Sequence, residues 1–340
     1  MKTPPVSTMD IYHGLVRPLL FRLDPELAHH AAHVAARALA PAWPILAGLL
    51  TFRRPELQVT MAGIPLANPV GLAAGFDKNG ALVEVLGHFG FGYAEIGSVT
   101  ACASQGNPRP RLFRLPDDQA LVNRMGLNGD GAEVIAKRLA TSRFSLPVGL
   151  NIAKTNDPAI KGDKAIQDFL TSFTHVKDLP VSYITVNASC PNTREGRLAE
   201  KEELSAVFAE MQKENRRGLP IFVKLSPDSS DELLADIIEA SKKFGLAGFV
   251  CGNTTTARPS LKTPPAEIDR IGPGGLSGPP LKELALTLCR RVYRLKGKDQ
   301  VIIAVGGIGS GADAYEFILN GAMAVQVYTA LVYRGPSLPR

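Results

Sequence analysis

Residues 301–327, VIIAVGGIGSGADAYEFILNGAMAVQV, contain the unit that decides the fold. The unit begins with the apolar run Val301–Val305, turns through glycines, and continues into an amphipathic segment that ends at Asn320-Gly321. A second apolar run, Ala324–Val327, follows. Short apolar runs that alternate with helical patterns predict parallel strands joined by helices.

Capping signals mark the helices of such units. Ser310 and Asp313 stand at the spacing of a capping box, in which two side chains satisfy free backbone N–H groups at a helix start. Asn320-Gly321 is typical of a helix end. Ser230 marks a second helix start, followed by the apolar positions Leu233, Leu234, Ile237 and Ile238. We therefore expect a helix after each of these two serines.

The same alternation extends outward from Leu57 to the end of the chain. Eight apolar runs fit strands: Val70–Ala73, Tyr93–Gly97, Val148–Ile152, Tyr183–Val186, Ile221–Leu225, Gly248–Cys251, Val301–Val305 and Ala324–Val327. Eight strands separated by helices predict an α/β fold of the closed (β/α)8 TIM barrel type. An open doubly wound sheet is the alternative, but it requires GxGxxG after the first strand, and residues 71–75 read GLAAG.

Residues 1–54 do not follow this alternation, and we expect them to form an N-terminal helical extension to a barrel of residues 55–340. A helical spacing of four separates Ile11, Leu15, Leu19 and Leu23. Asp24-Pro25 then predicts the cap and first residue of a second helix.

This second helix has two faces. One face carries Leu27, Ala31, Val34, Ala35 and Ala38, and the other carries Glu26, His30, His33 and Arg37. Two interpretations stay open: the helices pack on the barrel, or they form an interfacial module that enters a lipid surface and admits an apolar ligand.

The composition and net charge indicate which classes of molecule the protein could bind. The 340 residues carry a net charge of +6 and a pI of about 9.1, which favours anionic small molecules or an anionic membrane surface. The sequence has no long basic run and no nucleic-acid recognition motif, so no nucleic acid partner is expected. It also has no signal peptide and no run of about 18 apolar residues, which predicts that no segment spans a membrane.

The thiols and imidazoles predict no metal site. The four cysteines form no CxxC pair, and no histidine stands at zinc spacing from them, so we expect reduced thiols. Of these, Cys102, Cys251 and Cys289 are interpreted as buried core residues. The histidines lie in the extension or in helical segments, at positions 13, 29, 30, 33, 88 and 175, which argues against a histidine base.

In a barrel of this kind the active site lies at the carboxyl ends of the strands. Strands seven and eight end in Gly306-Gly307-Ile308-Gly309 and Tyr328-Thr329, the composition of a barrel phosphate site. The other strand ends are rich in amides and ammonium groups: Lys78, Asn151, Lys154, Asn187, Lys224 and Asn253. These donors suit flavin mononucleotide (FMN), because lysine stabilises the reduced anionic flavin and amides orient ring and substrate.

Cys190 stands apart from the other thiols. It lies in the loop after the fourth strand, between Asn187 and Asn192 and directly before Pro191. Nearby lysines favour the thiolate. We therefore expect Cys190 to be the catalytic base, with Ser189 as the alternative.

These residues carry a resemblance over nearly the whole chain to the class 2, quinone-dependent dihydroorotate dehydrogenases. The matching blocks are NPVGLAAGFDKNG (68–80), GNPRPRLFRLPDDQALVNRMGL (106–127), NASCPNT (187–193), FVKLSP (222–227), NTT (253–255), GGLSGP (274–279) and VGGI (305–308). The helical extension with Leu23-Asp24-Pro25-Glu26 also resembles class 2, since soluble class 1 members lack it.

The resemblance implies a set of site residues and no metal. It implies that FMN contacts Ala73, Ala74, Gly75, Phe76, Asp77, Ser98, Asn151, Asn187, Lys224, Gly252, Gly278, Gly307, Tyr328 and Thr329. It implies that dihydroorotate contacts Lys78, Asn123, Arg124, Met125, Gly126, Leu127, Asn187, Asn192, Asn253 and Thr254.

The resemblance further implies an activity and a location. The activity is oxidation of (S)-dihydroorotate to orotate in de novo pyrimidine (UMP) biosynthesis, with FMN as hydride acceptor and a membrane quinone as final acceptor. The implied partners are dihydroorotate, orotate, quinone and a membrane surface, and the implied location is peripheral, at the cytoplasmic face of the cell membrane.

Three features depart from the class 2 pattern. Cys190 occupies the base position, where class 2 members have serine and class 1 members have cysteine. Leu127 replaces a usual phenylalanine, and the chain stops at Arg340, where the family usually continues with a last helix. Two alternatives follow: a related FMN barrel that uses fumarate or another acceptor or substrate, and a flavin-binding barrel without activity.

Overall fold

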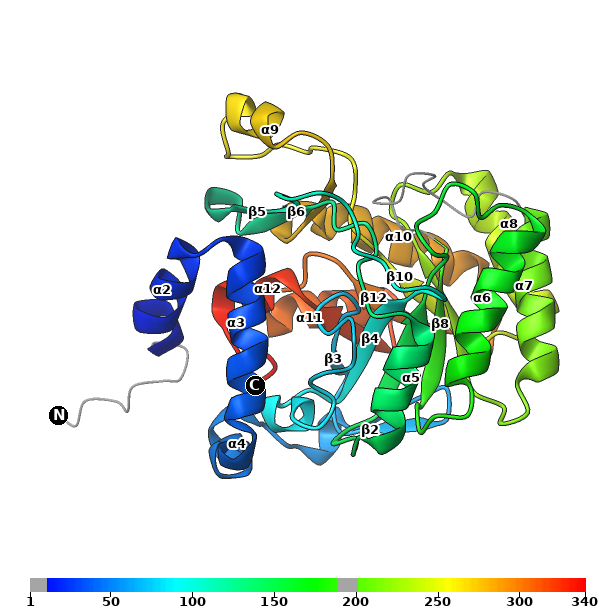
Figure 1. The fold of residues 1–340 in the computed structure, drawn as a ribbon, viewed down its shortest axis with the longest axis horizontal. Helices are drawn as coiled ribbons and strands as arrows, with labels where there is room; N and C mark the ends of the chain where they lie inside the picture. The colour runs from blue at the N-terminus through cyan, green and yellow to red at the C-terminus, as the bar shows by residue number, and fades with distance from the viewer. Residues whose placement is uncertain (1–10, 189–200) are drawn as a thin grey trace.

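A closed barrel of eight parallel strands forms the centre of the computed structural model, which describes residues 11–188 and 201–340 (Figure 1). The strands are β3 (Val70–Leu72), β4 (Tyr93–Val99), β7 (Val148–Ile152), β8 (Tyr183–Asn187), β9 (Ile221–Leu225), β10 (Gly248–Cys251), β12 (Val301–Val305) and β13 (Ala324–Val327). They follow the order β10-β12-β13-β3-β4-β7-β8-β9 around the ring. All eight predicted strands are present, and the TIM-barrel prediction is confirmed.

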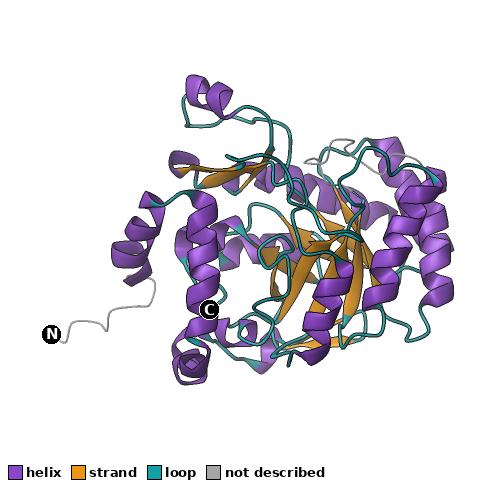
Figure 2. Ribbon diagram, in the orientation of Figure 1, coloured by secondary structure: helices purple, strands orange, loops and turns teal. Residues whose placement is uncertain are grey.

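Helices surround the strands on the outside of the barrel (Figure 2). They are α5 (Ala132–Thr141), α6 (Asp163–Val176), α7 (Lys201–Glu214), α8 (Asp231–Lys243), α10 (Lys282–Leu295), α11 (Gly311–Leu319) and α12 (Thr329–Arg334). Ser230 and Ser310 cap α8 and α11, as their spacing predicts. The expected alternation is wrong between β3 and β4, where the glycine-rich connection forms only the short 3-10 helix η4 (Leu86–Phe89).

A hairpin closes the amino-terminal end of the barrel. Its strands are β1 (Val59–Met61) and β2 (Ile64–Leu66), which pair antiparallel. Met61 is fully buried in a cluster with Tyr93 and Tyr183, which stand at the starts of β4 and β8. Because the hairpin fills this end, the opposite end of the barrel is left for the site.

A second small sheet lies above the strand ends. It has the order β11-β6-β5, from β5 (Leu112–Leu115), β6 (Ala120–Asn123) and β11 (Gly275–Ser277). The helix α9 (Pro265–Ile271) projects beside it (Figure 1). Sequence analysis did not predict this sheet, which carries Asn123 to the rim of the barrel.

The N-terminal extension forms the π-helix η1 (Tyr12–Val16) and the helices α2 (Arg17–Arg22), α3 (Pro25–Ala38) and α4 (Trp43–Leu50). Short 3-10 turns lie at η2 (Ala40–Ala42) and η3 (Pro55–Leu57), and a third, η5 (Pro116–Asp118), joins β5 to β6. The Asp24 carboxylate caps α3 as predicted, because it accepts hydrogen bonds from the N–H groups of Glu26 and Leu27.

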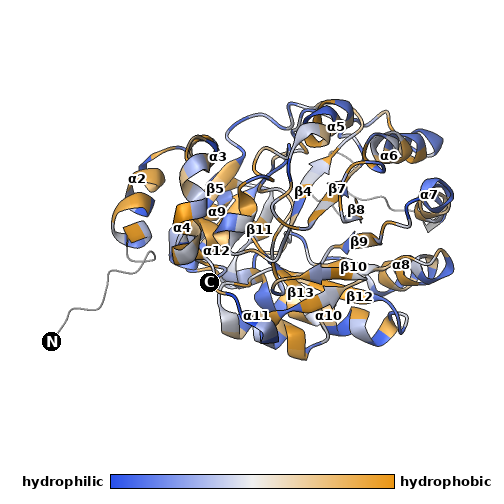
Figure 3. Ribbon diagram, turned by 90° about the horizontal axis from the view of Figure 1, so that it is seen from below, coloured by the Kyte–Doolittle hydropathy of each residue, from blue (hydrophilic) through white to orange (hydrophobic). Residues whose placement is uncertain are grey.

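The side of α3 that contacts the barrel carries Glu26, Ala28, His29 and His33, whereas His30 and Arg37 of the predicted polar face are exposed. Glu26 pairs with Arg111, and the His29 ring lies 5.0 Å from the Phe76 ring, measured between centroids. Many large apolar residues of the extension face outward instead, as the hydropathy colouring of α2 and α4 in Figure 3 illustrates, although Leu50 is buried. They are exposed at Ile11, Leu15, Leu19, Leu27, Val34, Ile45 and Leu49.

No single helix within the described ranges is long and apolar enough to cross a membrane. Among the described residues, only the helix pair Pro25–Ala38 and Ala40–Leu50 meets the length and composition test, and that pair is bent by 58°.

Candidate active site

A cavity of about 1020 Å³ opens at the carboxyl ends of the strands. The last residues of β4, β8 and β9 and the loops that follow β3, β10 and β13 line it, together with one face of α3. A smaller cavity of about 290 Å³ adjoins it beside the ends of β12 and β13. Ala74, Lys224, Asn253, Thr254 and Tyr328 line both cavities, so the two are neighbouring parts of one site.

The structure brings most of the expected cofactor residues into these cavities. The larger cavity includes Ala74, Gly75, Phe76, Asp77, Ser98, Asn187, Lys224 and Tyr328. The smaller cavity adds Ala73, Gly278, Gly307 and Thr329. Asn151 and Gly252 line neither cavity.

Asn151 lies directly behind the cavity wall, where it holds the side chains in front of it. The Ser98 hydroxyl donates a hydrogen bond to the side-chain oxygen Oδ1 of Asn151, and the Asn187 side-chain amide donates to Ser98 Oγ at 3.0 Å. The Asn151 amide donates to Glu95 at 2.8 Å. A chain of polar groups thus runs from the barrel centre to the cavity surface.

Glu95 is the centre of this chain and is fully buried. Its carboxylate also accepts hydrogen bonds from Thr185 Oγ1 and Gln326 Nε2, each at 3.0 Å, and from the Tyr183 hydroxyl at 3.3 Å. Sequence reasoning missed Glu95. The available signal was its position as the only charged residue within the strand Tyr93–Val99.

Glycines shape the smaller cavity into a backbone cradle. Gly307 has a φ of 71°, and a Cβ there would lie 2.6 Å from Lys282 Cα. Gly278 has a φ of 104°, and a Cβ there would lie 2.9 Å from Ala120 Cα. Side chains are therefore excluded, and backbone can approach a phosphate closely.

Two buried side-chain oxygens face this region without a partner among the described residues: Thr254 Oγ1 and Gln326 Oε1. Buried polar atoms in proteins normally have a hydrogen-bond partner. Their orphaned state, together with the glycine cradle and the buried Lys224, fits a large polar group with a phosphate end.

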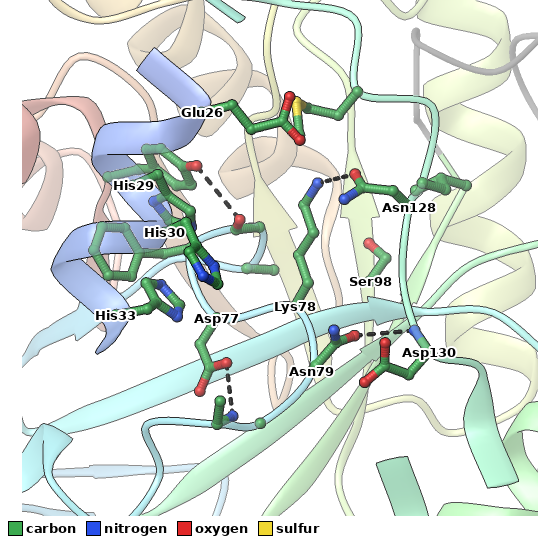
Figure 4. A pocket seen from close by; sticks show the side chains of 18 of the residues that line it. Glu26, His29, His30, His33, Asp77, Lys78, Asn79, Ser98, Asn128 and Asp130 are labelled. Atoms are coloured by element: carbon green, nitrogen blue, oxygen red, sulfur yellow. Dashed lines mark hydrogen bonds between the residues drawn. The ribbon is translucent and has the colours of Figure 1, made fainter. Parts of the chain in front are cut away.

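The substrate side of the larger cavity contains most of the residues that the resemblance implied. Lys78, Asn123, Met125, Gly126, Leu127, Asn187, Asn253 and Thr254 line it. Figure 4 shows Lys78 extended across the cavity toward Asn128, whose side-chain oxygen accepts its hydrogen bond. Arg124 does not line the cavity and instead donates to the carbonyls of Ile271 and Pro273. Cys190 and Asn192 lie outside the described residues.

Aromatic and imidazole rings form the wall toward the N-terminal extension. The Phe76 ring centroid lies 5.0 Å from that of His29, 5.4 Å from His33 and 5.7 Å from Tyr328. Burial lowers the pKa of His29 to about 3 and also lowers the pKa of His33. Burial raises the pKa of Tyr328 to about 12. At neutral pH this wall is therefore uncharged.

The acidic groups near the site have structural partners. The Asp77 carboxylate accepts hydrogen bonds from the N–H groups of Ala81 and Leu82, at 2.8 and 2.7 Å, and burial raises its pKa. Hydrogen bonding to Arg111 lowers the pKa of Glu26. In the described part of the chain, no group of three or more His, Cys, Asp and Glu residues could hold a metal.

Two of the three described cysteines are buried as expected, namely Cys251 and Cys289. The prediction for Cys102 is wrong, because it is exposed in the loop that follows β4. Other lining residues that sequence reasoning missed are Glu26, Gln119, Asn128, Ser277, Lys282 and Arg334.

Comparisons with known proteins agree with this geometry. A model of the family described as dihydroorotate dehydrogenase matches residues 56–340. A Mycobacterium tuberculosis protein named dihydroorotate dehydrogenase (quinone) is 46% identical over 328 residues, covering 95% of this chain and 90% of that protein. The Gloeobacter violaceus protein of the same name is 42% identical over 337 residues, covering 98% of this chain and 92% of that protein.

Solved structures give the same result. The crystal structure of dihydroorotate dehydrogenase from Eimeria tenella in complex with ferulenol superposes with a TM-score of 0.81 at 33% sequence identity. The superposition covers 95% of this chain and 92% of that one. The chain belongs to the dihydroorotate dehydrogenase family.

Proposed function

We propose that this protein oxidises (S)-dihydroorotate to orotate, with FMN as cofactor and a membrane quinone as final electron acceptor, in de novo pyrimidine (UMP) biosynthesis. The observation that carries the proposal is one cavity lined both by the polar strand ends and by helix α3 of the extension. The strand ends suit a polar anionic substrate, and the extension offers an apolar outer surface. The quinone-dependent relatives named above support the same activity.

FMN fits the two adjoining cavities. The glycine cradle at Gly278 and Gly307, with Thr329, would hold its phosphate, and Ala74, Gly75 and Lys224 would contact its ring. When bound, FMN supplies the redox chemistry by accepting a hydride and releasing electrons in a later step. Lys224 is only 5% exposed, so its positive charge would act in a medium with little screening.

The substrate residues match the chemistry of dihydroorotate, which has one carboxylate and two amide edges. Lys78 would attract the carboxylate, because a charge-assisted hydrogen bond is stronger than a neutral one. The side-chain amides of Asn123, Asn192 and Asn253 can donate and accept, as two amide edges require. The Thr254 hydroxyl, orphaned among the described residues, would gain a partner from the bound substrate.

Cys190 is the proposed base. Its Sγ would take the proton from C5 of dihydroorotate, and an ordinary cysteine pKa of about 8.5 makes a thiolate accessible near neutral pH. The buried amides of Asn151 and Asn187 keep the cavity wall in one arrangement, which would hold a bound substrate in one orientation.

The N-terminal helices are the proposed route for the quinone. The outward side chains of Leu15, Leu19 and Ile45 are 61%, 54% and 84% exposed, an arrangement that suits insertion into a lipid interface. The wall of His29, Phe76 and Tyr328 is uncharged and lies between these helices and the strand ends. We therefore propose peripheral attachment at the cytoplasmic face of the membrane.

Anaerobic reduction of the FMN-loaded protein tests the proposal. Addition of dihydroorotate is expected to bleach the oxidised-flavin absorbance, and a quinone analogue is then expected to restore it. A flavin-loaded protein that dihydroorotate does not bleach would contradict the substrate. Reoxidation by fumarate and not by quinone would favour the alternative acceptor, which Cys190 at the class 1 base position motivates.

A further inference from the structure

Arg111 is a buried cation at the junction between helix α3 and the barrel. Its side chain is 6% exposed, and the Glu26 carboxylate that it contacts is 18% exposed. Arg111 Nη2 lies 2.6 Å from Glu26 Oε1, and Arg111 Nε lies 3.1 Å from Glu26 Oε2. Two parallel bonds of this kind fix the orientation of both side chains, because the planar fork matches the carboxylate.

The same guanidinium also holds a loop of the barrel. Arg111 Nη1 donates to the carbonyls of Gln105 and Asn107, at 2.5 and 2.9 Å. The backbone carbonyl of Arg111 accepts a hydrogen bond from the Arg124 N–H at 2.9 Å. A single residue therefore joins α3, the Gln105–Asn107 loop and Arg124, which directly follows β6.

That loop in turn holds the substrate segment, residues 123–127. The Asn107 N–H donates to the Met125 carbonyl at 3.0 Å, and the Asn107 amide donates to the Arg124 carbonyl at 2.9 Å. Gly126 packs so closely on Asn107 that a Cβ on this glycine would lie 2.6 Å from Asn107 Cγ. Any displacement of the loop must therefore move Met125 and Gly126, which line the cavity.

We propose that Arg111 couples the docking of helix α3 to the geometry of the substrate segment, so that the N-terminal helices set the affinity for dihydroorotate and orotate. Arg111 acts as a positioning residue and lines neither cavity. The inference rests on the proposed function, because it takes the 123–127 segment as the dihydroorotate site. Coupling is reciprocal, so orotate binding also strengthens the docking of α3.

Orotate titration of the oxidised, FMN-loaded full chain measures this coupling through the change in flavin absorbance. Glu26→Gln and Arg111→Met are each expected to weaken orotate binding about fivefold to tenfold, the lower range of measured couplings. The double variant is expected to bind as weakly as either single variant, because both changes break one link. Dihydroorotate KM should rise in parallel, with a smaller change in the rate of flavin reduction.

Two matched variants separate coupling from general loosening of the extension. Arg109→Gln removes a guanidinium that contacts the same carboxylate at 3.0 Å; Arg109 lines the larger cavity, but its side chain is 72% exposed. Arg114→Met removes an anchor of α2, whose guanidinium contacts the Leu23 carbonyl and the Phe21 ring. Both are expected to bind orotate within about twofold of the parent, because the Arg109–Glu26 pair and the contacts of Arg114 with α2 do not hold the Gln105–Asn107 loop.

Amide hydrogen exchange measures the docking of α3 directly in the parent protein, without any substitution. Orotate is expected to slow amide exchange in α3 of the parent protein and to leave α11 unchanged. Equal exchange in α3 with and without orotate would overturn the coupling, as would a folded Glu26→Gln protein with parental orotate affinity. Equal weakening by Arg114→Met would also overturn it. A parent protein whose flavin does not respond to orotate would instead refute the proposed function and the inference together.

Discussion

The Glu95 carboxylate lies 2.8 Å from the Asn151 amide nitrogen in the buried centre of the barrel. Asn151 in turn accepts the hydrogen bond of Ser98, which lines the larger cavity. The wall of the proposed flavin site therefore rests on a buried acidic residue that lines neither cavity.

Replacement of Glu95 by alanine is expected to damage both stability and flavin retention. The change leaves four buried donors unpaired, on Asn151, Tyr183, Thr185 and Gln326. Breaking a buried polar network of this kind costs about 3–5 kcal/mol of unfolding free energy. Urea unfolding and the flavin-to-protein ratio measure the two effects. Glu133→Ala, in an exposed ion pair on α5, is the control and should change neither.

The glycine cradle predicts a difference between two positions in one loop. Gly307→Ala places a methyl group 2.6 Å from Lys282 Cα at a φ of 71°, so we expect loss of about 1–3 kcal/mol of stability and weaker FMN binding. Gly309→Ala meets its nearest atom, Ala330 Cβ, at 3.5 Å and should retain FMN. Fluorescence titration with FMN compares them, and equal affinities would argue against a steric role of Gly307.

Acid stability is expected to depend on His29. Its pKa in the folded protein is about 3, below the ordinary value of 6.5, because of burial. The unfolded protein therefore binds more protons between these two pH values, and stability falls as pH falls through this window. One such group contributes a slope of at most about 1.4 kcal/mol per pH unit.

His29→Phe keeps a ring beside Phe76 and removes this proton uptake. We expect a shallower loss of stability between pH 6 and pH 4 (roughly the centre of the titration window), measured by urea unfolding. His175→Phe alters an exposed residue of α6 and serves as the control. Identical slopes for His29→Phe and the parent protein would rule out His29 as the source.

Cys190 is expected to control the rate of flavin reduction. Cys190→Ala should lower this rate by about 10²–10⁴ while orotate still binds, because the base is removed and the binding residues remain. Cys190→Ser should move the pH profile to alkaline values, since a hydroxyl holds its proton more tightly than a thiol. Stopped-flow reduction with dihydroorotate measures both, and an unchanged rate in Cys190→Ala would point to Ser189.

Vesicle binding is expected to depend on the outward face of the extension. Ile45 is 84% exposed on α4, so Ile45→Asp should reduce cosedimentation with lipid vesicles and leave flavin reduction by dihydroorotate intact. Leu319→Asp changes a residue that is 67% exposed on α11, within the barrel domain, and should bind vesicles like the parent. Equal binding by both variants would locate the lipid contact elsewhere.

The barrel could be predicted from sequence because its strands are continuous apolar runs buried on both faces. Five of the eight match their predicted bounds residue for residue, including Val148–Ile152 and Ile221–Leu225. The β5-β6-β11 sheet was not predicted, because its strands interrupt the alternation of strands and helices. Its strand β6 also pairs with residues 275–277, which lie far away in the sequence.

Only some residues of the candidate site could be predicted from sequence. Residues next to strand ends, such as Lys224 and Tyr328, follow from barrel geometry once the strands are placed. Glu95 and Arg111 do not, because their roles depend on partners brought close by the fold, such as Asn151 and Glu26. The orientation of α3 was also open, since both of its faces could have met the barrel.

The ring of strands closes where Val325 of β13 pairs with Val70 of β3. These two strands lie near opposite ends of the barrel's amino-acid sequence. During translation β3 therefore leaves the ribosome long before β13 is synthesised. One edge of β3 stays unpaired until then. Unpaired strand edges invite association between nascent chains. Slow elongation, or a stall before residue 324, should thus prolong the exposure of this unpaired edge to chaperones and proteases.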